Sequence, residues 1–514
     1  MAKTIMVQGT GSHVGKSVLV AALCRIFYQD GYRVAPFKSQ NMALNSYVTR
    51  DGGEMGRAQV VQAEAAGIEP RVEMNPILLK PTGHTSSQVV VLGRPLGNMA
   101  AQEYHLNYTQ NALGMIEDCL NKLGAEFDII CIEGAGSPVE INLKPRDIVN
   151  MRIAKMAKAP VLLVVDIDKG GALASIVGTL ELLDPDEREL VQGIVINKFR
   201  GDIALLRPAL DFLEERTGKP VVGVVPYFQG FRVQEEDSLA EEQQMARTAQ
   251  GGDIDVAVIR LPHISNFTDF DSLEDEPDVN LRYIGRGDVI GSPDLLIIPG
   301  TKNTIDDMVY LTNSGYASRI RELSVSGLPV IGICGGFQML GRIIRDPLHT
   351  EGSVEEVSGL GLIDMETVFD PDKITNQAEG EVYGSGTFLD QVRGEKVTGY
   401  EIHMGRTDLG RGVEPAFRIT SRSGSPVDIL DGAVGSRGLV FGTYLHGIFD
   451  NDQFRRHLLN KVRAFKGLKP LEGKSGPATW EQRNQDYNRL ADVVRSALDM
   501  KKIREILGLP AGRE

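Results

Sequence analysis

Two short stretches of the chain carry residue types that do chemistry, and the first is the glycine-rich GTGSHVGKS at residues 9–17. A usual phosphate loop has four residues between its first glycine and the Gly-Lys pair, whereas five residues separate Gly9 from Gly15 here. The stretch follows the apolar run TIMV and precedes apolar residues at helical spacing, which is the strand–loop–helix setting that phosphate binding requires. We therefore expect the loop to bind a nucleotide, with Lys16 reaching its terminal phosphates and Ser17 a magnesium ion. The alternative is a tight turn with a solvated lysine.

The ends of two other apolar runs carry polar residues that suit the same nucleotide. Glu133 ends DIICIE, and Asn197 lies in the stretch INKFRGD. In open α/β sheets ligands gather at the carboxyl ends of strands, and a carboxylate that ends an apolar strand must be paired or coordinated. We predict that Glu133 binds magnesium, in preference to capping a helix, and that the Asn197 amide holds a purine ring.

The second reactive stretch is LPVIGICGGFQMLG, in which residues 332–336 read G-x-C-x-G. This spacing is that of a nucleophile elbow, where a reactive side chain lies on a sharp strand-to-helix turn between small residues. A helix N-terminus favours a thiolate, and neighbouring backbone N–H groups stabilise an oxyanion. We therefore predict that Cys334 is a nucleophile. Cys24 and Cys119 lie in helical patterns and Cys131 lies in an apolar strand, where cysteine is usually a small core residue.

A thiol nucleophile needs a base, which is usually histidine. Two of the eight histidines lie in turns after β-rich runs: His446 in LVFGTYLHGIF and His403 in YEIHMGRT. A single histidine is more often structural than catalytic, and spacing alone does not choose between these two.

Short β-rich runs alternate with helical patterns along the chain and would position these residues. The runs are TIMV, RVAPF, DIICIE, PVLLVVD, GIVIN and PVVGVVP, and then DVAVIRLP, DLLIIPG, LPVIGICGG and LVFGTYLHG. Continuous apolar runs suit strands buried on both faces of a parallel sheet, and intervening helices give a doubly wound α/β fold. The polar, acidic residues 234–253 predict a surface helix and a linker. We predict a phosphate-loop α/β domain at 1–230, a linker at 231–253, a second α/β domain at 254–465 and a helical tail at 466–514.

Composition excludes several classes of partner. The 514 residues suit two or three domains, and 42% hydrophobic with 24% charged residues is typical of a soluble globular protein. The net charge of −14 argues against general nucleic-acid binding, because no basic face would meet the phosphates. No apolar run reaches membrane-spanning length, the N-terminus lacks a signal-peptide pattern, and four scattered cysteines fit a reducing compartment. We expect a cytoplasmic protein with neither nucleic-acid nor membrane partners, and its oligomeric state is not predicted.

These stretches and several others form one pattern along the chain. In order they are GTGSHVGKS, PFKSQNMALNS, GGEMGRAQ, NPILLKP, EGAGSPVEINL, DIDKGGALASIVGT, INKFRGD, PGTKNT, GICGGFQMLG, YEIHMG and GTYLHGIFDN. The pattern resembles the cobyric acid synthase family, the glutamine-dependent amidases of vitamin B12 biosynthesis. It covers nearly everything to about residue 465, and SQNMALNS and EGAGSPVEINL are its most specific stretches because they separate this family from its relatives.

The resemblance implies roles for residues of the N-terminal half, which is similar to dethiobiotin synthetase. That family has a loop of the same form, G-T-x-x-x-V-G-K-[ST]. The similarity implies ATP binding by Gly9, Thr10, Gly11, Ser12, Val14, Gly15, Lys16 and Ser17. It also implies Mg²⁺ binding by Ser17 and Glu133, with Glu54 in GEMGRAQ as a further acidic ligand.

The C-terminal half looks like a class I glutamine amidotransferase domain. Cys334 would be the nucleophile and His446 its base, with the N–H groups of Gly300 and Gly335 stabilising the oxyanion. The chain departs from that class at the carboxylate that orients the histidine, because the usual His-x-Glu reads His-Gly-Ile at residues 446–448. The sequence identifies no substitute.

The resemblance further implies an ATP- and glutamine-dependent reaction on a corrinoid. L-glutamine would supply ammonia at Cys334, and ATP with Mg²⁺ would activate the b, d, e and g carboxylates of adenosylcobyrinic acid a,c-diamide. The corrin ring leaves no spacing signature, although Asn41 and Asn45 in SQNMALNS are candidates for binding it. Two alternatives are cobyrinic acid a,c-diamide synthase, with the same two-domain plan, and a ParA-like ATP-driven switch protein, which would give no reason for the cysteine elbow.

Overall fold

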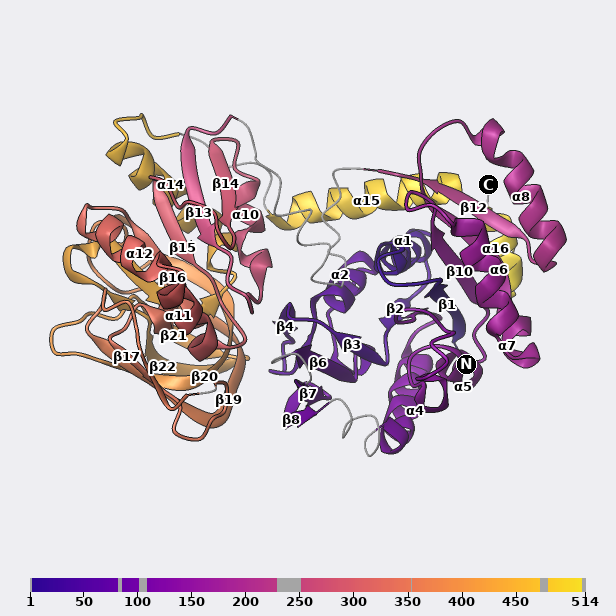
Figure 1. The fold of residues 1–514 in the computed structure, drawn as a ribbon, viewed down its shortest axis with the longest axis horizontal. Coiled ribbons are helices and arrows are strands. Elements are labelled where there is room, and N and C mark those ends of the chain that lie inside the picture. The colour runs from indigo at the N-terminus through magenta and orange to yellow at the C-terminus, as the bar shows by residue number, and fades with distance from the viewer. Residues whose placement is uncertain are drawn as a thin grey trace.

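The computed structural model describes residues 2–81, 86–100, 109–228, 251–352, 354–471 and 479–510. They form two α/β lobes that lie side by side (Figure 1). The first lobe runs to strand β12 (Val221–Pro226) and the second begins at β13 (Ile254–Ile259), so the predicted two-domain α/β class is confirmed. The linker predicted at 231–253 and its surface helix lie almost wholly outside the described residues.

A six-stranded parallel sheet forms the centre of the first lobe, in the order β12-β11-β10-β1-β9-β2. Its strands are β1 (Lys3–Gly9), β2 (Val34–Phe37), β9 (Ile129–Glu133), β10 (Val161–Asp166), β11 (Val191–Phe199) and β12. All six apolar runs predicted in this half are therefore strands. β2 and β9 lie on one side of β1, and from β9 the chain crosses to β10 on the other side of β1. Ligands bind at such switch points, beside the carboxyl ends of the strands.

Helices cover both faces of this sheet, because successive side chains of a strand point to opposite faces. Along β1, Met6 packs into one hydrophobic core while Ile5 and Val7 pack into another. The first core includes helices α4 (Thr109–Glu126), α5 (Met151–Ala157), α6 (Ala172–Leu182) and α8 (Ile203–Thr217), with the short α7 (Pro185–Leu190) between the last two. The second includes α1 (Lys16–Gln29), and α2 (Arg57–Ala65) contributes to both.

Two small sheets of the first lobe face the second lobe (Figure 1). Their strands are β3 (Gln40–Met42), β6 (Ile77–Pro81), β7 (Ser86–Val91) and β8 (Arg94–Ala100) in one sheet, and β4 (Ser46–Val48) and β5 (Glu54–Gly56) in the other. The backbone N–H of Ser46 donates to Asn266 Oδ1 at 2.9 Å across the boundary, and the N–H of Phe267 donates to Asn45 Oδ1 at 3.2 Å. Asn45, a candidate for corrinoid binding, thus helps to join the lobes.

The second lobe contains a mainly parallel sheet in the order β14-β13-β15-β16-β24-β23. Its strands are β13, β14 (Val279–Ile284), β15 (Leu295–Ile298), β16 (Val330–Ile333), β23 (Ala433–Val434) and β24 (Val440–Thr443). Helices of this lobe are α10 (Asp271–Glu274), α11 (Thr304–Asn313), α12 (Tyr316–Val325), α13 (Gly335–Met339) and α14 (Asp452–Phe465). The predicted elbow lies where β16 passes into α13.

A seven-stranded, largely antiparallel sheet completes the second lobe and was not predicted. Its strands are β17 (Ile343–Arg345), β18 (Glu356–Ser358), β19 (Met365–Val382), β20 (Lys396–Leu409), β21 (Phe417–Arg422), β22 (Ser425–Asp431) and β25 (Leu445–His446). Most side chains of β19 are only partly buried or exposed, so the strand lacks the continuous apolar run of a strand buried on both faces. β19 pairs with β20, and β20 pairs with β25. These pairings place the two candidate histidines, His403 on β20 and His446 on β25, beside the elbow.

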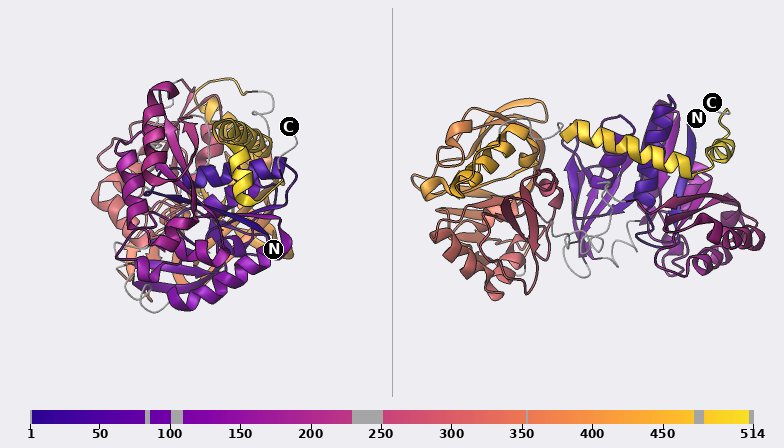
Figure 2. Two further views of the ribbon diagram at one scale, coloured as in Figure 1. Left: turned by 90° about the vertical axis from the view of Figure 1, so that its right-hand side faces the viewer. Right: turned by 90° about the horizontal axis from the view of Figure 1, so that it is seen from above.

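The C-terminal tail returns to the first lobe. Its helices are α15 (Thr479–Ala497) and α16 (Met500–Leu507), and α15 lies along the first lobe next to α1 (Figures 1 and 2, yellow). Leu490 and Val494 are fully buried in the core that contains α1, and Arg495 forms an ion pair with Asp30 at 2.8 Å. The tail, which carries no recognised motif, is therefore a structural part of the first lobe. No helix among the described residues is long and apolar enough to cross a membrane.

Candidate active sites

The predicted phosphate loop joins the end of β1 to the start of α1. Gly9 ends β1, the connection contains Thr10, Gly11, Ser12, Val14 and Gly15, and Lys16 and Ser17 begin the helix. A Cβ on Gly9 would lie 2.5 Å from the side chain of Val14, so this first position has room only for glycine. Lys16 Nζ donates to the carbonyl oxygen of Gly11 at 2.9 Å and to a carbonyl of the loop after β9 at 3.3 Å. The longer loop therefore curls over the lysine ammonium group.

Glu133 lies fully buried at the carboxyl end of β9, next to this loop. Ser17 Oγ donates to one of its oxygens at 2.7 Å, Lys38 Nζ lies 3.1 Å from the same oxygen, and Gln62 Nε2 donates to the other at 2.5 Å. Burial raises the pKa of Glu133, but the attraction of Lys38 and the hydrogen bonds from Ser17 and Gln62 bring it below its ordinary value. The carboxylate is held ionised beside the phosphate loop.

The oxygens of Ser17 and Glu133 fit a magnesium site. A hydroxyl and a carboxylate oxygen 2.7 Å apart suit neighbouring positions around Mg²⁺, which usually takes its remaining ligands from water and phosphates. Among the described residues there is no group of three or more His, Cys, Asp or Glu side chains that could hold a metal ion.

Glu54, the third predicted magnesium ligand, has lysine partners in the structure, and its role in binding magnesium stays a prediction. It is fully buried, and its two oxygens pair with Lys80 at 2.7 Å and with Lys373 at 2.5 Å. Burial raises the pKa of Glu54, but these two ammonium groups lower it well below its ordinary value. Because Lys373 belongs to the second lobe, Glu54 forms an ionic bridge between the lobes.

Asn197 lies against the phosphate loop, and its predicted contact with a purine ring stays a prediction. Its Nδ2 donates to the carbonyl oxygen of Val14 at 2.8 Å, and it lies so close to Gly15 that a Cβ there would overlap it. The amide therefore supports the phosphate loop from β11. This position explains the glycine before Lys16 better than it explains contact with a purine ring.

Cys334 lies on a strained turn between β16 and α13. Its φ of 51° and ψ of −108° are unusual for a residue with a Cβ, and such strain is common where a side chain is held for chemistry. The neighbouring glycines are required by packing, because a Cβ on Gly332 would lie 2.6 Å from the carbonyl oxygen of Gly336. A Cβ on Gly336 would overlap the backbone of Ile298. The local geometry is that of the predicted nucleophile elbow.

His446 is the histidine that interacts with Cys334. The interaction with Cys334 helps to raise the pKa of this histidine, and the Sγ of Cys334 donates to the carbonyl oxygen of Ile402 at 3.4 Å. On its other side, His446 Nδ1 lies 2.7 Å from Asp269 Oδ2, and the N–H of Gly447 donates to Asp269 Oδ1 at 2.9 Å. Burial lowers the pKa of His446, but the attraction of Asp269 and then of Cys334 outweighs it and raises the pKa to about 10. The ring of Tyr400 stacks on the imidazole, with 5.3 Å between ring centroids.

Asp269 occupies the position of the orienting carboxylate that the sequence did not identify. It lies in the 3₁₀ turn Phe267–Phe270 after β13, 177 residues before His446, and both side chains are nearly fully buried. In the sequence, Asp269 could be noticed only as an acidic residue that follows a predicted strand. Asp271 and Asp275 follow the same strand. Only the three-dimensional fold distinguishes Asp269 from these neighbours.

His403, the other candidate base, lies near Cys334 but makes no hydrogen bond with it among the described residues. Its ring stacks on Tyr444 with 3.7 Å between ring centroids, and burial lowers the pKa of His403. Neither ring nitrogen has a hydrogen-bond partner in the described part of the chain, and Glu401 lies 3.9 Å away. The geometry therefore favours His446 as the base.

The two glycines predicted to form the oxyanion hole lie in segments that touch, Gly300 in the loop after β15 and Gly335 at the start of α13. A Cβ on Gly300 would lie 2.9 Å from His446 Cε1, and a Cβ on Gly335 would lie 2.6 Å from the side chain of Thr301. The structure thus brings Gly300, Gly335 and His446 together around the elbow. Their catalytic roles stay predictions.

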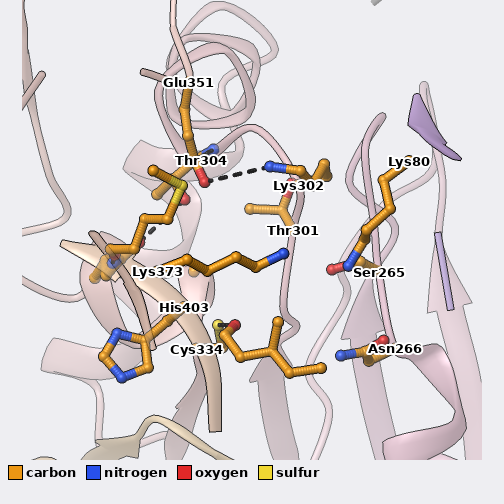
Figure 3. Close-up of a pocket in the computed structure, with 14 residues that line it drawn as sticks. Lys80, Ser265, Asn266, Thr301, Lys302, Thr304, Cys334, Glu351, Lys373 and His403 are labelled. Atoms are coloured by element: carbon orange, nitrogen blue, oxygen red, sulfur yellow. Dashed lines mark hydrogen bonds and ion pairs between the residues drawn. The ribbon is translucent and has the colours of Figure 1, made fainter. Parts of the chain in front are cut away.

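A pocket opens beside Cys334 and reaches the boundary between the lobes (Figure 3). The residues that line it are Lys80, Ser265, Asn266, Thr301, Lys302, Thr304, Cys334, Gly335, Gln338, Glu351, Lys373, Ile402, His403 and Met404. Lys80 comes from β6 of the first lobe and reaches Glu54, which Lys373 reaches from β19. Both lobes therefore contribute to the wall of this pocket.

Comparisons with known proteins agree with this two-site architecture. Residues 5–239 match the CobQ/CobB/MinD/ParA nucleotide binding domain, and residues 255–454 match the CobB/CobQ-like glutamine amidotransferase domain. The cobyric acid synthase of Pelotomaculum thermopropionicum is 60% identical over 516 aligned positions, which cover 100% of this chain and 98% of that protein. Those of Moorella thermoacetica and Desulfitobacterium hafniense are each 57% identical over 99% of this chain and over 98% and 99% of their own lengths. The chain therefore belongs to the cobyric acid synthase family.

Proposed function

We propose that this protein is a glutamine-hydrolysing amidoligase that uses ATP to amidate the b, d, e and g carboxylates of adenosylcobyrinic acid a,c-diamide. The observation that carries the proposal is the presence of two complementary sites in one chain. One is a cysteine–histidine–aspartate arrangement, and the other is a phosphate loop beside an ionised carboxylate. Full-length similarity to proteins named cobyric acid synthase supports the substrate.

At the glutaminase site, Cys334 attacks the side-chain amide carbon of glutamine. His446 holds the thiol proton and delivers it to the departing ammonia, and Asp269 orients the imidazole and stabilises its charged form. The N–H groups of Gly300 and Gly335 stabilise the oxyanion. Water then hydrolyses the thioester and glutamate leaves.

At the synthetase site, the phosphate loop and Lys16 hold the phosphates of ATP while a corrinoid carboxylate attacks the terminal phosphorus. The phosphorylated carboxylate has a good leaving group, which ammonia displaces to give the amide. Ser17 and Glu133 would hold Mg²⁺, and the ion would neutralise charge on the phosphates. Lys38, Gln59 and Gln62 orient Glu133 from the interior of the lobe.

Mass spectrometry of adenosylcobyrinic acid a,c-diamide incubated with the protein, ATP, Mg²⁺ and glutamine tests this function. The expected result is four successive acid-to-amide changes that each require ATP. A product with no added amide would contradict the proposal. Two changes on cobyrinic acid would instead indicate the a,c-diamide synthase, and ATP-driven association without release of glutamate would indicate a ParA-like switch. Full-length relatives and the glutamine amidotransferase domain disfavour both alternatives.

A further inference from the structure

A long ion pair lies in the pocket beside Cys334. Lys302 Nζ and Glu351 Oε1 are 3.8 Å apart, although their side chains are only 8% and 7% exposed. A charged hydrogen bond normally closes to about 2.7–2.9 Å. Across the described chain, Lys302 Nζ has no hydrogen bond, whereas Glu351 Oε2 accepts one from the backbone N–H of Thr304 at 3.1 Å.

Both charges of this pair are poorly compensated by the protein. Burial lowers the pKa of Lys302 more than Glu351 restores it, and burial raises the pKa of Glu351 more than Lys302 lowers it. Buried charges normally have partners at hydrogen-bonding distance, because the loss of hydration is costly. Lys302 can therefore bind a further anion, and Glu351 can bind a further cation.

The other charged groups in this part of the pocket are already engaged. Lys80 and Lys373 each bind one oxygen of Glu54, and Lys80 also donates to Ser46 while Lys373 donates to Gln88. Lys302 and Glu351, in contrast, are paired with each other only at 3.8 Å.

The position of the pair relates it to the nucleophile. Lys302 follows the loop of Gly300 and Thr301, and the charge of Cys334 is among the influences on the pKa of Lys302. Figure 3 shows Lys302 and Glu351 on one side of the pocket and Cys334 on the other, with Lys373 between them. A ligand that extends across the pocket would touch both the pair and the thiol.

We propose that Lys302 binds the α-carboxylate of glutamine and that Glu351 binds its α-ammonium group. The two groups are attached to one carbon atom and carry opposite charges, which matches a lysine and a glutamate held close together but apart. Glutamine bound in this way extends its side-chain amide towards Cys334 and the oxyanion loop. The inference rests on the proposed glutaminase activity and adds to it a basis for selecting the free amino acid.

Two glutamine analogues separate the roles of these residues. Glutaramate lacks the α-ammonium group, and 4-aminobutanamide lacks the α-carboxylate. Ammonia release from glutamine and from each analogue is measured for the full-length protein, Lys302→Gln and Glu351→Gln. Lys396→Gln, at an exposed lysine that begins β20, is the matched control.

The wild type should hydrolyse each analogue with a kcat/KM roughly 10- to 100-fold below that for glutamine, as expected for loss of a charged hydrogen bond. Glu351→Gln should remove the difference between glutamine and glutaramate while keeping the difference for 4-aminobutanamide. Lys302→Gln should show the opposite pattern, and Lys302→Arg should keep most of the affinity for glutamine.

Amidation from ammonium chloride reports whether each variant is folded, since it does not require glutamine. If folded variants keep both analogue differences, or exchange the two patterns, the assignment of Lys302 and Glu351 is wrong while the proposed function stands. If the wild type releases no ammonia from glutamine, the proposed function and this inference fail together.

Discussion

The nucleotide site and the glutaminase site differ in how the chain builds them. The phosphate loop is one continuous stretch, residues 9–17, to which the fold adds Glu133 from the neighbouring strand. The glutaminase site combines Asp269, Gly300, Cys334 and His446 with a pocket wall that includes Lys80 from the other lobe. A site made from one segment can be recognised from spacing, whereas a site assembled from distant loops needs the fold.

The largest expected effect is on glutamine-dependent amidation, when the nucleophile of the glutaminase site is removed. Cys334→Ala should lower glutamine-dependent amidation by at least about 10⁴-fold, because no other group provides the covalent step. Amidation from ammonium chloride should remain near the wild-type rate. Cys119→Ala, the same change at a buried cysteine of α4, should leave both rates unchanged. Equal loss of both rates in Cys334→Ala would mean that the two sites are not separable.

The reciprocal change is Lys16→Ala. Loss of the ammonium group beside the phosphates should lower amidation by roughly 10³-fold from either nitrogen source, while glutamine hydrolysis continues. Parallel assays of amide formation and glutamate release measure this, with Lys122→Ala, at an exposed lysine of α4, as control. Retention of ammonia-dependent amidation would contradict the role of Lys16.

Asp269→Asn tests the carboxylate that the sequence did not reveal. It should lower kcat for glutamine hydrolysis by about 10²- to 10⁴-fold, because the imidazole loses its orientation and the stabilisation of its charge. The raised pKa of His446, about 10, keeps the imidazole protonated at neutral pH, so activity that depends on this proton is lost as pH rises through about 10. In the variant this alkaline loss should move to lower pH by more than one unit. A pH–rate profile with an unchanged alkaline limb would show that Asp269 does not act through His446.

Glu54→Gln tests the bridge between the lobes. The change leaves Lys80 and Lys373 buried without their shared anion, so the protein should be destabilised by about 3–5 kcal/mol. The Mg²⁺ concentration that supports half-maximal amidation should stay unchanged, whereas Glu133→Gln should raise it. A higher Mg²⁺ requirement in Glu54→Gln would place Glu54 in the metal site.

The smallest expected effect on catalysis is that of Leu490→Ala in the tail. The residue is fully buried against α1, so its truncation should lower the local stability of the first lobe by about 2–5 kcal/mol. Hydrogen exchange should increase in α1 and leave the second lobe protected. Leu459→Ala in α14 should give the opposite distribution. Unchanged exchange in α1 would show that the tail is not part of this lobe.

The sequence predicted all six strands of the first parallel sheet and β13, β15, β16 and β24 of the second, because these strands are largely apolar runs. The edge strand β14, with its alternating burial, was not predicted. The sequence also did not predict β19, because this strand lies in a sheet that is partly exposed to solvent and therefore mixes polar with apolar residues. The elbow at Cys334 was predicted from five residues, but Asp269 was not, because its partner lies 177 residues away. Glu54 was assigned to magnesium, and the sequence did not reveal the two lysines that neutralise it.

The most direct test of the account is the origin of the amide nitrogen in the product. Full-length protein is incubated with amide-¹⁵N glutamine, ATP, Mg²⁺ and adenosylcobyrinic acid a,c-diamide, and the product is weighed by mass spectrometry. The wild type should give four ¹⁵N amides, Cys334→Ala should give none, and Cys334→Ala should give four when ¹⁵N ammonium chloride replaces glutamine. Incorporation of ¹⁵N from glutamine by Cys334→Ala would contradict the account.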